Sequence, residues 1–532
     1  MRRKNFILTV IVMCVVMLAT TACGGSGGNS GGGSGDDSGS APSGDDSAAR
    51  VLRVGTTESG GGFNPWGATR TMLGNYLVFD TIVRRTPDGK DYDPWCTSYE
   101  YTDPTTMVIT LRDDVTFSDG DKLSGEDVVF TFERAADPSL SIQANYFDSI
   151  DFEKSTVSDD GLTVTFKFKQ EYGPFESFLD TPMLVNKSAV EDWSMDDERW
   201  WDAPVASGPY EVAENVSGSH TTYKLRDDYW NKDFPIDWDE IIVNYYSDPT
   251  AMFVAFENKE IDLVIDVAAQ DAARLESGEV ANAEEVKYEE LPSNSAYLLH
   301  MSPDKKEFQD PKVREAVANA IDRTAVGDVA YNTLWQEVDS VLPAGVLYYK
   351  STGTYDKGIE YAKQCMAESG YPDGFDAKVI AMNLDSKVWE VIQSGLSELG
   401  INLTTEAYDL NTCLPLWMEQ GSTDLMLMNV PGGNVMGEPF VSLSQTSENG
   451  GMPGARVMDA EYNELFNASI FTTNHETRTE KTGEVQQWLY DNFQAIPLIE
   501  DTHCFAYHTD AISECGFNSA VRADLLYCRA AQ

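Results

Sequence analysis

The sequence has few positive charges and lacks the short motifs of several common enzyme classes. Lysine and arginine number 38 against 87 aspartates and glutamates, which gives a formal net charge of −49 at pH 7. So acidic a chain is a poor partner for nucleic acid or anionic lipid. Its plainest role is to keep an exported protein soluble, and an attraction for cationic solutes is the alternative. The GxSxG pattern occurs only within the Gly/Ser-rich residues 24–32, and HExxH and GxxxxGK[ST] are absent, which argues against enzymes that depend on these motifs.

Cysteine is scarce, and its spacing gives no zinc-binding pattern. No CxxC pair and no Cys/His ligand spacing of the zinc type occurs among the eight cysteines. His503, Cys504 and His508 are the one group that a soft metal would suit, but no motif supports it, and we expect neither a metal site nor a cofactor. Disulfides and buried free thiols are both open for six cysteines: Cys96, Cys365, Cys413, Cys504, Cys515 and Cys528.

No apolar run is long enough to cross a membrane, but the N-terminus resembles a bacterial lipoprotein signal. Basic residues 2–4 precede an apolar run of 14 residues, 6–19, short of the ~20 residues that a span needs. The following TTAC ends at Cys23, the expected site of lipid attachment, although Thr20 stands where such signals usually have Leu. Ordinary signal cleavage or an uncleaved anchor is the alternative. Residues 24–49 are rich in Gly and Ser, as expected of a flexible tether.

Residues 107–138 predict a strand, a turn and a helix. The alternation of residues 108–112 is typical of a half-buried strand. Ser118-Asp119-Gly120-Asp121 favours a turn. Ser124 is a candidate N-cap with Asp127 three residues later, and Pro138 ends the helix.

The same stretch carries a resemblance to a known family. Residues 111–134, LRDDVTFSDGDKLSGEDVVFTFER, resemble the signature of family 5 extracellular solute-binding proteins, the dipeptide, oligopeptide and nickel binders of ABC importers. Residues 310–323, DPKVREAVANAIDR, are similar to a second family signature, and GPYEV at 208–212 and YWN at 229–231 match shorter ones. The resemblance covers nearly all of the chain beyond the tether. It implies a binding protein and not an enzyme.

The resemblance implies an α/β fold of two lobes, periplasmic-binding-protein-like, of type II in its large class with an extra subdomain, and with a hinge between the lobes. The residues agree with an α/β lobe: residues 401–407 alternate as a strand, and the apolar run 424–430 suits a strand covered on both faces. The expected division is a signal peptide at 1–22, a tether at 23–49, lobe I at 50–98, 205–295 and 498–532, the subdomain at 99–204, and lobe II at 296–497.

The implied function is that of a lipid-anchored substrate-binding protein of an ABC importer on the extracytoplasmic face of the cell membrane. It would be a monomer that captures a peptide-like or other polar solute in the cleft between the lobes and delivers it to a permease powered by an ATPase, with no nucleic acid partner. Binding of an oligosaccharide or a metal chelate on the same fold, or a catalytic or adhesive surface lipoprotein, are the alternatives.

Two loops are the expected walls of the cleft, because ligands of open α/β sheets bind beyond the carboxyl ends of the strands. One is the Gly-rich loop after strand 51–54, for which a solvent loop with a packed Trp is the alternative. The other follows strand 424–430. Trp389 and Trp417 lie in helical patterns and are expected in the core, with stacking on a ligand as the alternative. The expected ligand-binding residues are Phe63, Asn64, Trp66, Asn429, Gly432, Gly433, Asn434, Val435 and Glu438.

The second loop departs from the pattern of the peptide binders. In the amine-binding members this segment resembles W-x-x-D-x-x-x-P, with the Asp pairing with the free amine of the peptide. Counting back from Pro439, the Asp position holds Val435 and the Trp position holds Gly432. Val offers no charge to an ammonium group, and burial of an unpaired charge costs several kcal/mol. Glu438 would substitute only if the loop were rearranged. A blocked peptide, a sugar or another polar solute is therefore expected.

We predict that unmodified dipeptides bind weakly and that Val435→Asp improves binding of free-amine peptides over their N-acetylated forms. A charge-assisted hydrogen bond contributes ~1.5–3 kcal/mol, so the preference should rise by roughly tenfold to a hundredfold. Calorimetry of both proteins with one peptide, free and acetylated, measures it. A strong preference of the unaltered protein for the free amine would instead point to another carboxylate, with Glu438 the first to test.

Overall fold

The computed structural model describes residues 49–58, 60–67, 72–85, 92–95, 97–141, 144–195, 197–431, 443–444, 446–518 and 522–532. Residues Ala49–Gln532 form one compact unit. Within these described ranges, no helix combines the length and apolarity needed to cross a membrane. Cys23 and the tether lie outside the described residues, so their roles stay predictions.

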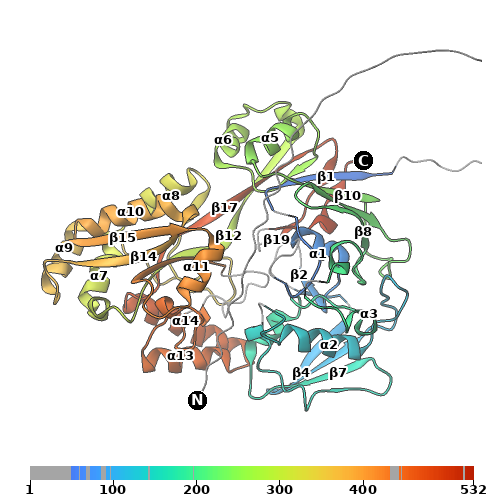
Figure 1. The fold of residues 1–532 in the computed structure, drawn as a ribbon, viewed down its shortest axis with the longest axis horizontal. Coiled ribbons are helices and arrows are strands. Elements are labelled where there is room, and N and C mark those ends of the chain that lie inside the picture. Colours follow the sequence, from blue (N-terminus) through green and yellow to red (C-terminus); the bar gives the residue numbers. More distant parts are fainter. Residues whose placement is uncertain are drawn as a thin grey trace, which may run out of the picture. The chain divides into compact units, whose positions relative to one another are not determined.

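An 11-stranded sheet runs through the unit in the order β15-β14-β16-β12-β17-β11-β1-β10-β9-β8, with β13 paired to β17 (Figure 1). Its parallel pairs are β1 with β10 and β11, and β14 with β15 and β16. The strands are β1 (Val51–Thr56), β8 (Tyr210–Val216), β9 (His220–Leu225), β10 (Glu240–Tyr245), β11 (Leu263–Val264), β12 (Val286–Met301), β13 (Trp335–Glu337), β14 (Phe375–Met382), β15 (Ile401–Tyr408), β16 (Leu425–Pro431) and β17 (Ile496–His508).

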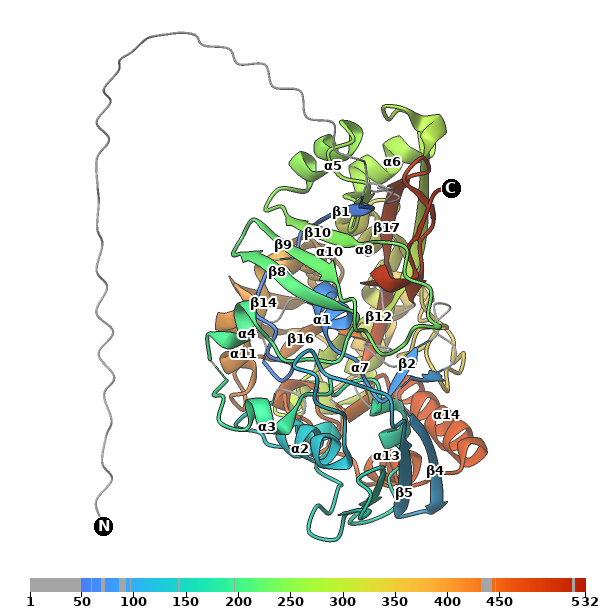
Figure 2. The ribbon, with the colours of Figure 1, turned by 90° about the vertical axis from the view of Figure 1, so that its right-hand side faces the viewer.

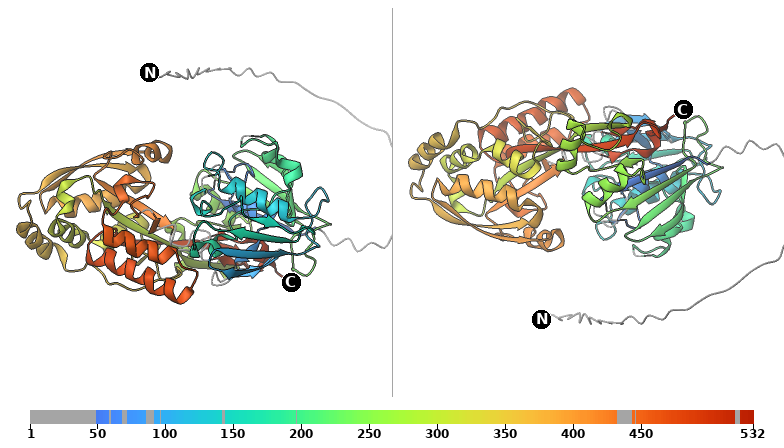
Figure 3. Two further views of the ribbon diagram at one scale, coloured as in Figure 1. Left: turned by 90° about the horizontal axis from the view of Figure 1, so that it is seen from below. Right: turned by 90° about the horizontal axis from the view of Figure 1, so that it is seen from above.

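Two long antiparallel strands, β12 and β17, join the two halves of this sheet. The second half of β12 pairs with β16, whereas the far end of β17 pairs with β11. Figure 3 shows β17, in red, running from one half toward the other. We use lobe I for the half with β1 and β8–β11, and lobe II for the half with β14–β16. The predicted boundary at 295/296 falls inside β12, and that at 497/498 inside β17. The division of the chain into domains stays a prediction.

Each lobe has its own apolar core. The lobe I core contains Leu52 and Val54 of β1, and the lobe II core contains Val317 and Ile392. In lobe II, α7–α10 pack on one face of the sheet and α11 on the other. Figure 2 shows α5 and α6 together beside β1. The main helices are α1 (Met72–Val78), α5 (Pro249–Glu257), α6 (Ala269–Ser277), α7 (Pro311–Ala320), α8 (Arg323–Tyr331), α9 (Gly358–Glu368), α10 (Ser386–Ser397), α11 (Leu410–Trp417), α13 (Ala460–Ile470) and α14 (His475–Asp491).

Strand β16 confirms the expectation of a strand covered on both faces. Leu425 and Leu427 enter the core beneath α7–α10, while Met426 packs with Cys413 and Trp417 of α11 on the opposite face. Successive side chains of a strand point to opposite faces, so this apolar run needs a helix layer on each side. Trp417, 4% exposed, is in the core as expected, and so is Trp389, 3% exposed.

A second sheet, β4-β5-β7-β6, lies within the segment expected to form the subdomain. The prediction for residues 107–138 is confirmed: β5 is followed by α2, whose N-cap is Ser124. The backbone N–H of Ser124 donates to Asp127 Oδ2 at 2.9 Å, which completes a capping box. These elements are β4 (Thr97–Asp103), β5 (Thr106–Leu111), β6 (Thr156–Val157), β7 (Thr163–Lys167), α2 (Gly125–Ala135), α3 (Lys187–Val190) and α4 (Arg199–Asp202).

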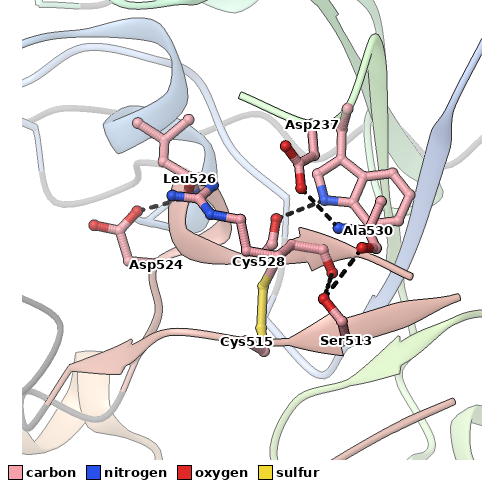
Figure 4. The surroundings of a disulfide bond; sticks show 9 residues. Asp237, Ser513, Cys515, Asp524, Leu526, Cys528 and Ala530 are labelled. Carbon is pink, nitrogen blue, oxygen red and sulfur yellow. Dashed lines mark hydrogen bonds between the residues drawn. A yellow bond between two sulfur atoms is a disulfide. The ribbon is translucent and has the colours of Figure 1, made fainter. Parts of the chain in front are cut away.

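Short strands complete the described chain, and a disulfide closes a loop within its C-terminal segment (Figure 4). Cys515 is bonded to Cys528. Next to it, Trp238 Nε1 donates to the carbonyl of Cys528 at 2.8 Å, and the Ala530 N–H donates to Asp237 at 3.0 Å. Cys365, Cys413 and Cys504 are free and buried, and Cys96 lies outside the described residues. The short strands are β2 (Val83–Arg85), β3 (Tyr92–Pro94), β18 (Ile512–Glu514), β19 (Phe517–Asn518), β20 (Arg522–Ala523) and β21 (Arg529–Ala530).

Candidate ligand-binding site

The carboxyl ends of the parallel strands β1, β10 and β11 meet at one edge of lobe I. Asp266 follows β11 with φ +62°, a left-handed conformation that is strained for most residues other than Gly. Its Oδ1 lies 2.7 Å from Nδ1 of His503, which β17 places beside it. The backbone strain at Asp266 is thus coupled to an ion pair at this edge.

His503 links Asp266 to a second carboxylate. Its Nε2 lies 3.6 Å from Asp501 Oδ2, and Ser293 Oγ of β12 donates to Asp501 Oδ1 at 2.5 Å. Burial alone would lower the pKa of His503, but hydrogen bonds with Asp266 and Asp501, together with their charges, outweigh burial and raise the pKa to about 9. His503 is therefore a cation at neutral pH, held between two carboxylates.

Glu500, the neighbour of Asp501 in β17, is buried at the point where the pairing of β12 with β17 is interrupted. Its carboxylate accepts from the Asn294 N–H at 2.6 Å and from Gln336 Nε2 of β13 at 2.5 Å. Asn294 has φ +52° and lies in the register break between Pro292 and Ala296. Burial raises the pKa of Glu500 to about 7 against the opposing effect of these two donors. The hinge strands thus carry a titratable carboxyl group at their irregular point.

The carboxyl ends of β14 and β16 form the corresponding edge of lobe II. Asp385 follows β14 in a single 3-10 turn (Asn383–Asp385), and Asn429 stands near the end of β16. Opposite Asn429 in the ladder is Tyr297, whose hydroxyl accepts from the hydroxyl of Tyr331. Burial, together with the charges of Asp501 and Asp385, raises the pKa values of both tyrosines. Since Asp501 also pairs with His503, the polar groups of the two edges are within electrostatic reach of one another.

A cavity of about 780 Å³ lies between the 99–204 segment and lobe II. One wall includes Asp148, Lys169 and Tyr172, and the other includes Glu448 and Asn463. The two walls are joined nearby, where Glu171 accepts from the backbone N–H of Thr473 at 2.6 Å. Its size and mixed lining suit a solute of peptide dimensions.

The structure places the first three expected ligand-binding residues within lobe I. Phe63 is fully buried, and Trp66, 2% exposed, packs edge-on against Trp200. Asn64 donates from Nδ2 to the Met195 carbonyl at 2.8 Å and accepts from the Trp66 N–H at 3.0 Å. Trp66 is therefore packed, as the alternative interpretation of this loop, a solvent loop with a packed Trp, expects. A contact of these residues with ligand stays a prediction.

The Gly-rich loop approaches other groups closely, as expected, but the neighbours are side chains of the protein itself. A Cβ at Gly55 would stand 2.4 Å from Cδ1 of Ile261, and a Cβ at Gly60 would stand 2.3 Å from the Tyr245 ring. Because any side chain would displace these groups, both positions favour glycine.

Asn429 is the one expected residue of the second loop that the structure describes. Its Oδ1 is buried without a hydrogen bond. His503, Cys504 and His508 do not converge, since His503 pairs with Asp266 and His508 Nε2 contacts the Phe256 carbonyl at 2.8 Å. Across the described residues, no group of three His, Cys, Asp or Glu side chains is arranged to hold a metal ion. Outside the described residues lie Gly432, Gly433, Asn434, Val435 and Glu438.

The sequence interpretation did not select the charged residues of the two edges. Asp266, Asp385 and Asp501 each follow or lie within an apolar strand, and the rule on carboxyl ends of strands applies to Asp266 and Asp385. The expected cleft walls, the loops after β1 and β16, do not include these residues. Asp501 has one local partner, His503 two residues further along β17, whereas Ser293 reaches Asp501 through strand pairing.

Two sheet halves with separate cores, two strands that join them and polar groups gathered at the carboxyl edges define a two-lobed binding protein of the periplasmic type. The family of bacterial extracellular solute-binding proteins, family 5, matches residues 93–452, in its middle region. The chain belongs to this family, whose members are solute-binding transport proteins and not enzymes.

Individual relatives agree with this assignment. The glutathione-binding protein GsiB of Salmonella paratyphi A is 26% identical over 313 residues, which is 58% of this chain and 59% of that protein. The substrate-binding protein CtaP of Listeria monocytogenes has 21% identity and a TM-score of 0.78, covering 91% of this chain and 100% of that one. DppA of Helicobacter pylori, in complex with the peptide STSA, has 19% identity and a TM-score of 0.75, covering 91% and 98%. The solved structures establish the two-lobed α/β fold.

We predict that the free energy of unfolding falls as pH rises from about 4.5 to about 9. Glu500 and His503 both have pKa values raised by folding, so each contributes stability below its unfolded pKa and loses it as pH rises through the folded value, about 7 and about 9. Glu500→Gln should flatten the decline below pH 7, and His503→Gln the decline above it. Denaturant titrations across this range measure both.

The exposed His475 supplies the control, because His475→Gln changes a histidine away from the hinge strands. If the free energy of unfolding of all three variants changes with pH in parallel with that of the unaltered protein, the assignment of the decline to Glu500 and His503 is refuted.

Proposed function

We propose that this protein is the lipid-anchored substrate-binding component of an ABC importer, which captures a peptide-like or other polar solute between its lobes and delivers it to the permease. The observation that carries the proposal is the pair of strands β12 and β17, which contribute to both halves of the sheet. Two lobes connected by a few extended segments are suited to hinge closure around a solute.

The hinge has the features that a change of angle requires. The register of β12 against β17 shifts between Pro292 and Ala296 and again between Ala296 and Leu298. A bulge leaves fewer ladder hydrogen bonds to break when the strands bend. Glu500 supplies a replacement acceptor for the N–H of Asn294 at this point. The local geometry supports bending there without loss of a buried hydrogen bond.

The solute class is inferred from the polar groups and from the relatives. Carboxylates, hydroxyls and an amide at the two edges offer directed hydrogen bonds, as a peptide-like solute needs. Two relatives are named for binding glutathione or are solved with a peptide. Peptide-like solutes are therefore the first class to test. Val435 and Gly432 stand where the amine-binding members have Asp and Trp, so blocked peptides belong in that test.

We expect solute binding to make the protein more compact in solution. Material that copurifies from cells grown in rich medium is identified by mass spectrometry, removed by partial unfolding and refolding, and then added back. Closure of the lobes lowers the radius of gyration measured by small-angle scattering. A sugar that gives no thermal shift is the control. An unchanged radius with a solute proven to bind would exclude hinge closure as the mechanism.

We also expect Cys23→Ser to release the protein from the cell surface. A lipidated cysteine at the start of residues 23–49 would hold the folded unit to the membrane through this Gly/Ser-rich segment. Fractionation of cells that express the full chain should move the protein from the membrane to the soluble extracytoplasmic fraction. A control substitution, Ser26→Ala, keeps Cys23 and should not change the fractionation. Retention of the Cys23→Ser variant in the membrane would favour an uncleaved anchor.

A further inference from the structure

Asp385 is a buried residue whose carboxylate has no hydrogen bond or ion pair within the described part of the chain. It is 3% exposed, at the point where β14 ends and α10 begins. Buried polar groups are almost always satisfied, and a buried charge nearly always has a partner. Among the residues that the structure describes, no group donates to its carboxylate, and Lys387, two residues later, is exposed and forms no ion pair with it.

Helix capping does not account for Asp385. The residue occupies the N-cap position of α10, but its side chain makes no capping hydrogen bond. Caps that do bond occur nearby in the same lobe, where Asp310 accepts from the Lys312 N–H and Asp409 from the Thr412 N–H. Burial raises the pKa of Asp385 to about 6, whereas a bonded cap would lower it.

A second unsatisfied acceptor lies at the same edge. Strands β14 and β16 are parallel, with Val379 level with Leu425, so their carboxyl ends emerge together. Asn429 near the end of β16 has a buried Oδ1 without a hydrogen bond. The Tyr331 hydroxyl donates to the Tyr297 hydroxyl, which also has a hydrogen bond with the side chain of Asn429. This edge therefore holds the buried Oδ1 of Asn429 and the carboxylate of Asp385, and within the described part of the chain neither accepts a hydrogen bond.

The charge around these acceptors is negative. Asp501 acts on the same two tyrosine hydroxyls as Asp385 does. The cation of the region, His503, is bound between Asp266 and Asp501. A group with several N–H donors and a positive charge would satisfy both acceptors and offset the charge. A neutral or anionic group would leave the carboxylate uncompensated.

We propose that Asp385 binds a cationic nitrogen of the solute, a protonated amine or a guanidinium, with Asn429 Oδ1 accepting a further N–H from it. The inference rests on the proposed function and narrows it to solutes that carry a positive charge. The position is separate from the loop position of Val435, so the cation need not be the free amine of a peptide. A protonated amine and a guanidinium are distinguished by mass once the solute is isolated.

The test uses the full chain and the material that it carries from rich medium. A methanol extract of the purified protein is separated by cation exchange at pH 7, and each fraction is added to stripped protein in a thermal-shift titration. We expect the rebinding activity in the retained, cationic fraction. We expect Asp385→Asn to weaken rebinding by roughly tenfold to a hundredfold. Asp373→Asn, an exposed carboxylate of the same lobe, is the matched control and leaves rebinding unchanged.

Stability gives a second readout that a purely structural carboxylate would not show. Without solute at pH 8, Asp385→Asn removes an uncompensated buried charge, so the Tm should rise by about 1–3 °C, and the gain should shrink at pH 5, below the raised pKa. A structural Asp385 would instead lower the Tm on substitution. Rebinding in the neutral or anionic fraction, or equal rebinding by Asp385→Asn, overturns the assignment of Asp385 and leaves the proposed function intact. The absence of rebinding by any fraction overturns both.

Discussion

The pairing of β12 with β17 is the constraint on which the rest of the structure depends. These strands, of 16 and 13 residues, belong to both halves of one hydrogen-bonded sheet. Their ladder fixes the position of each lobe's carboxyl edge, because β11 pairs with β17 and β16 pairs with β12. The buried Glu500 satisfies the backbone where this ladder is interrupted. A continuous ladder would be stiffer, and a ladder without this acceptor would leave an N–H group of Asn294 unpaired in the interior.

Two buried acidic groups near the hinge lower the free energy of unfolding at neutral pH. Asp385 and Glu500 are carboxyl groups whose pKa values burial raises to about 6 and about 7, so at neutral pH their charge opposes folding. Asp266 is held at a positive φ. Strain and uncompensated charge of this kind persist where a site needs them, and the two cores supply the stability that offsets them.

Local patterns predicted the scaffold well because the scaffold is built from local rules. The capping box of Ser124 and Asp127 and the two-faced strand β16 follow from the spacing of residues within one element. The surroundings of Trp66 could not be predicted in this way. Its neighbour Trp200 lies more than a hundred positions away in the chain, and no local pattern indicates that the two rings meet. The contact of Asp266 with His503 is non-local in the same sense, since it exists only after β11 has paired with β17, whereas Asp501 lies two residues from His503 in the same strand.

The second family signature shows why the class of protein is easier to read from the sequence than its solute. Asp322 in this motif caps α8 by accepting from the Ala325 N–H at 2.9 Å. Arg323 donates to the Pro497 carbonyl at 2.9 Å, at the start of β17, and to the Tyr355 carbonyl at 2.6 Å. These bonds fix the position at which β17 enters lobe II. The two-lobed fold needs them whichever solute it binds. In the proposed site, solute selection instead depends on side chains at the carboxyl edge of lobe II, Asp385 and Asn429. A substitution at Asp385 or Asn429 can change the charge of the edge without disturbing any hydrogen bond of the 310–323 motif. The motif therefore identifies the fold but carries no information about the solute.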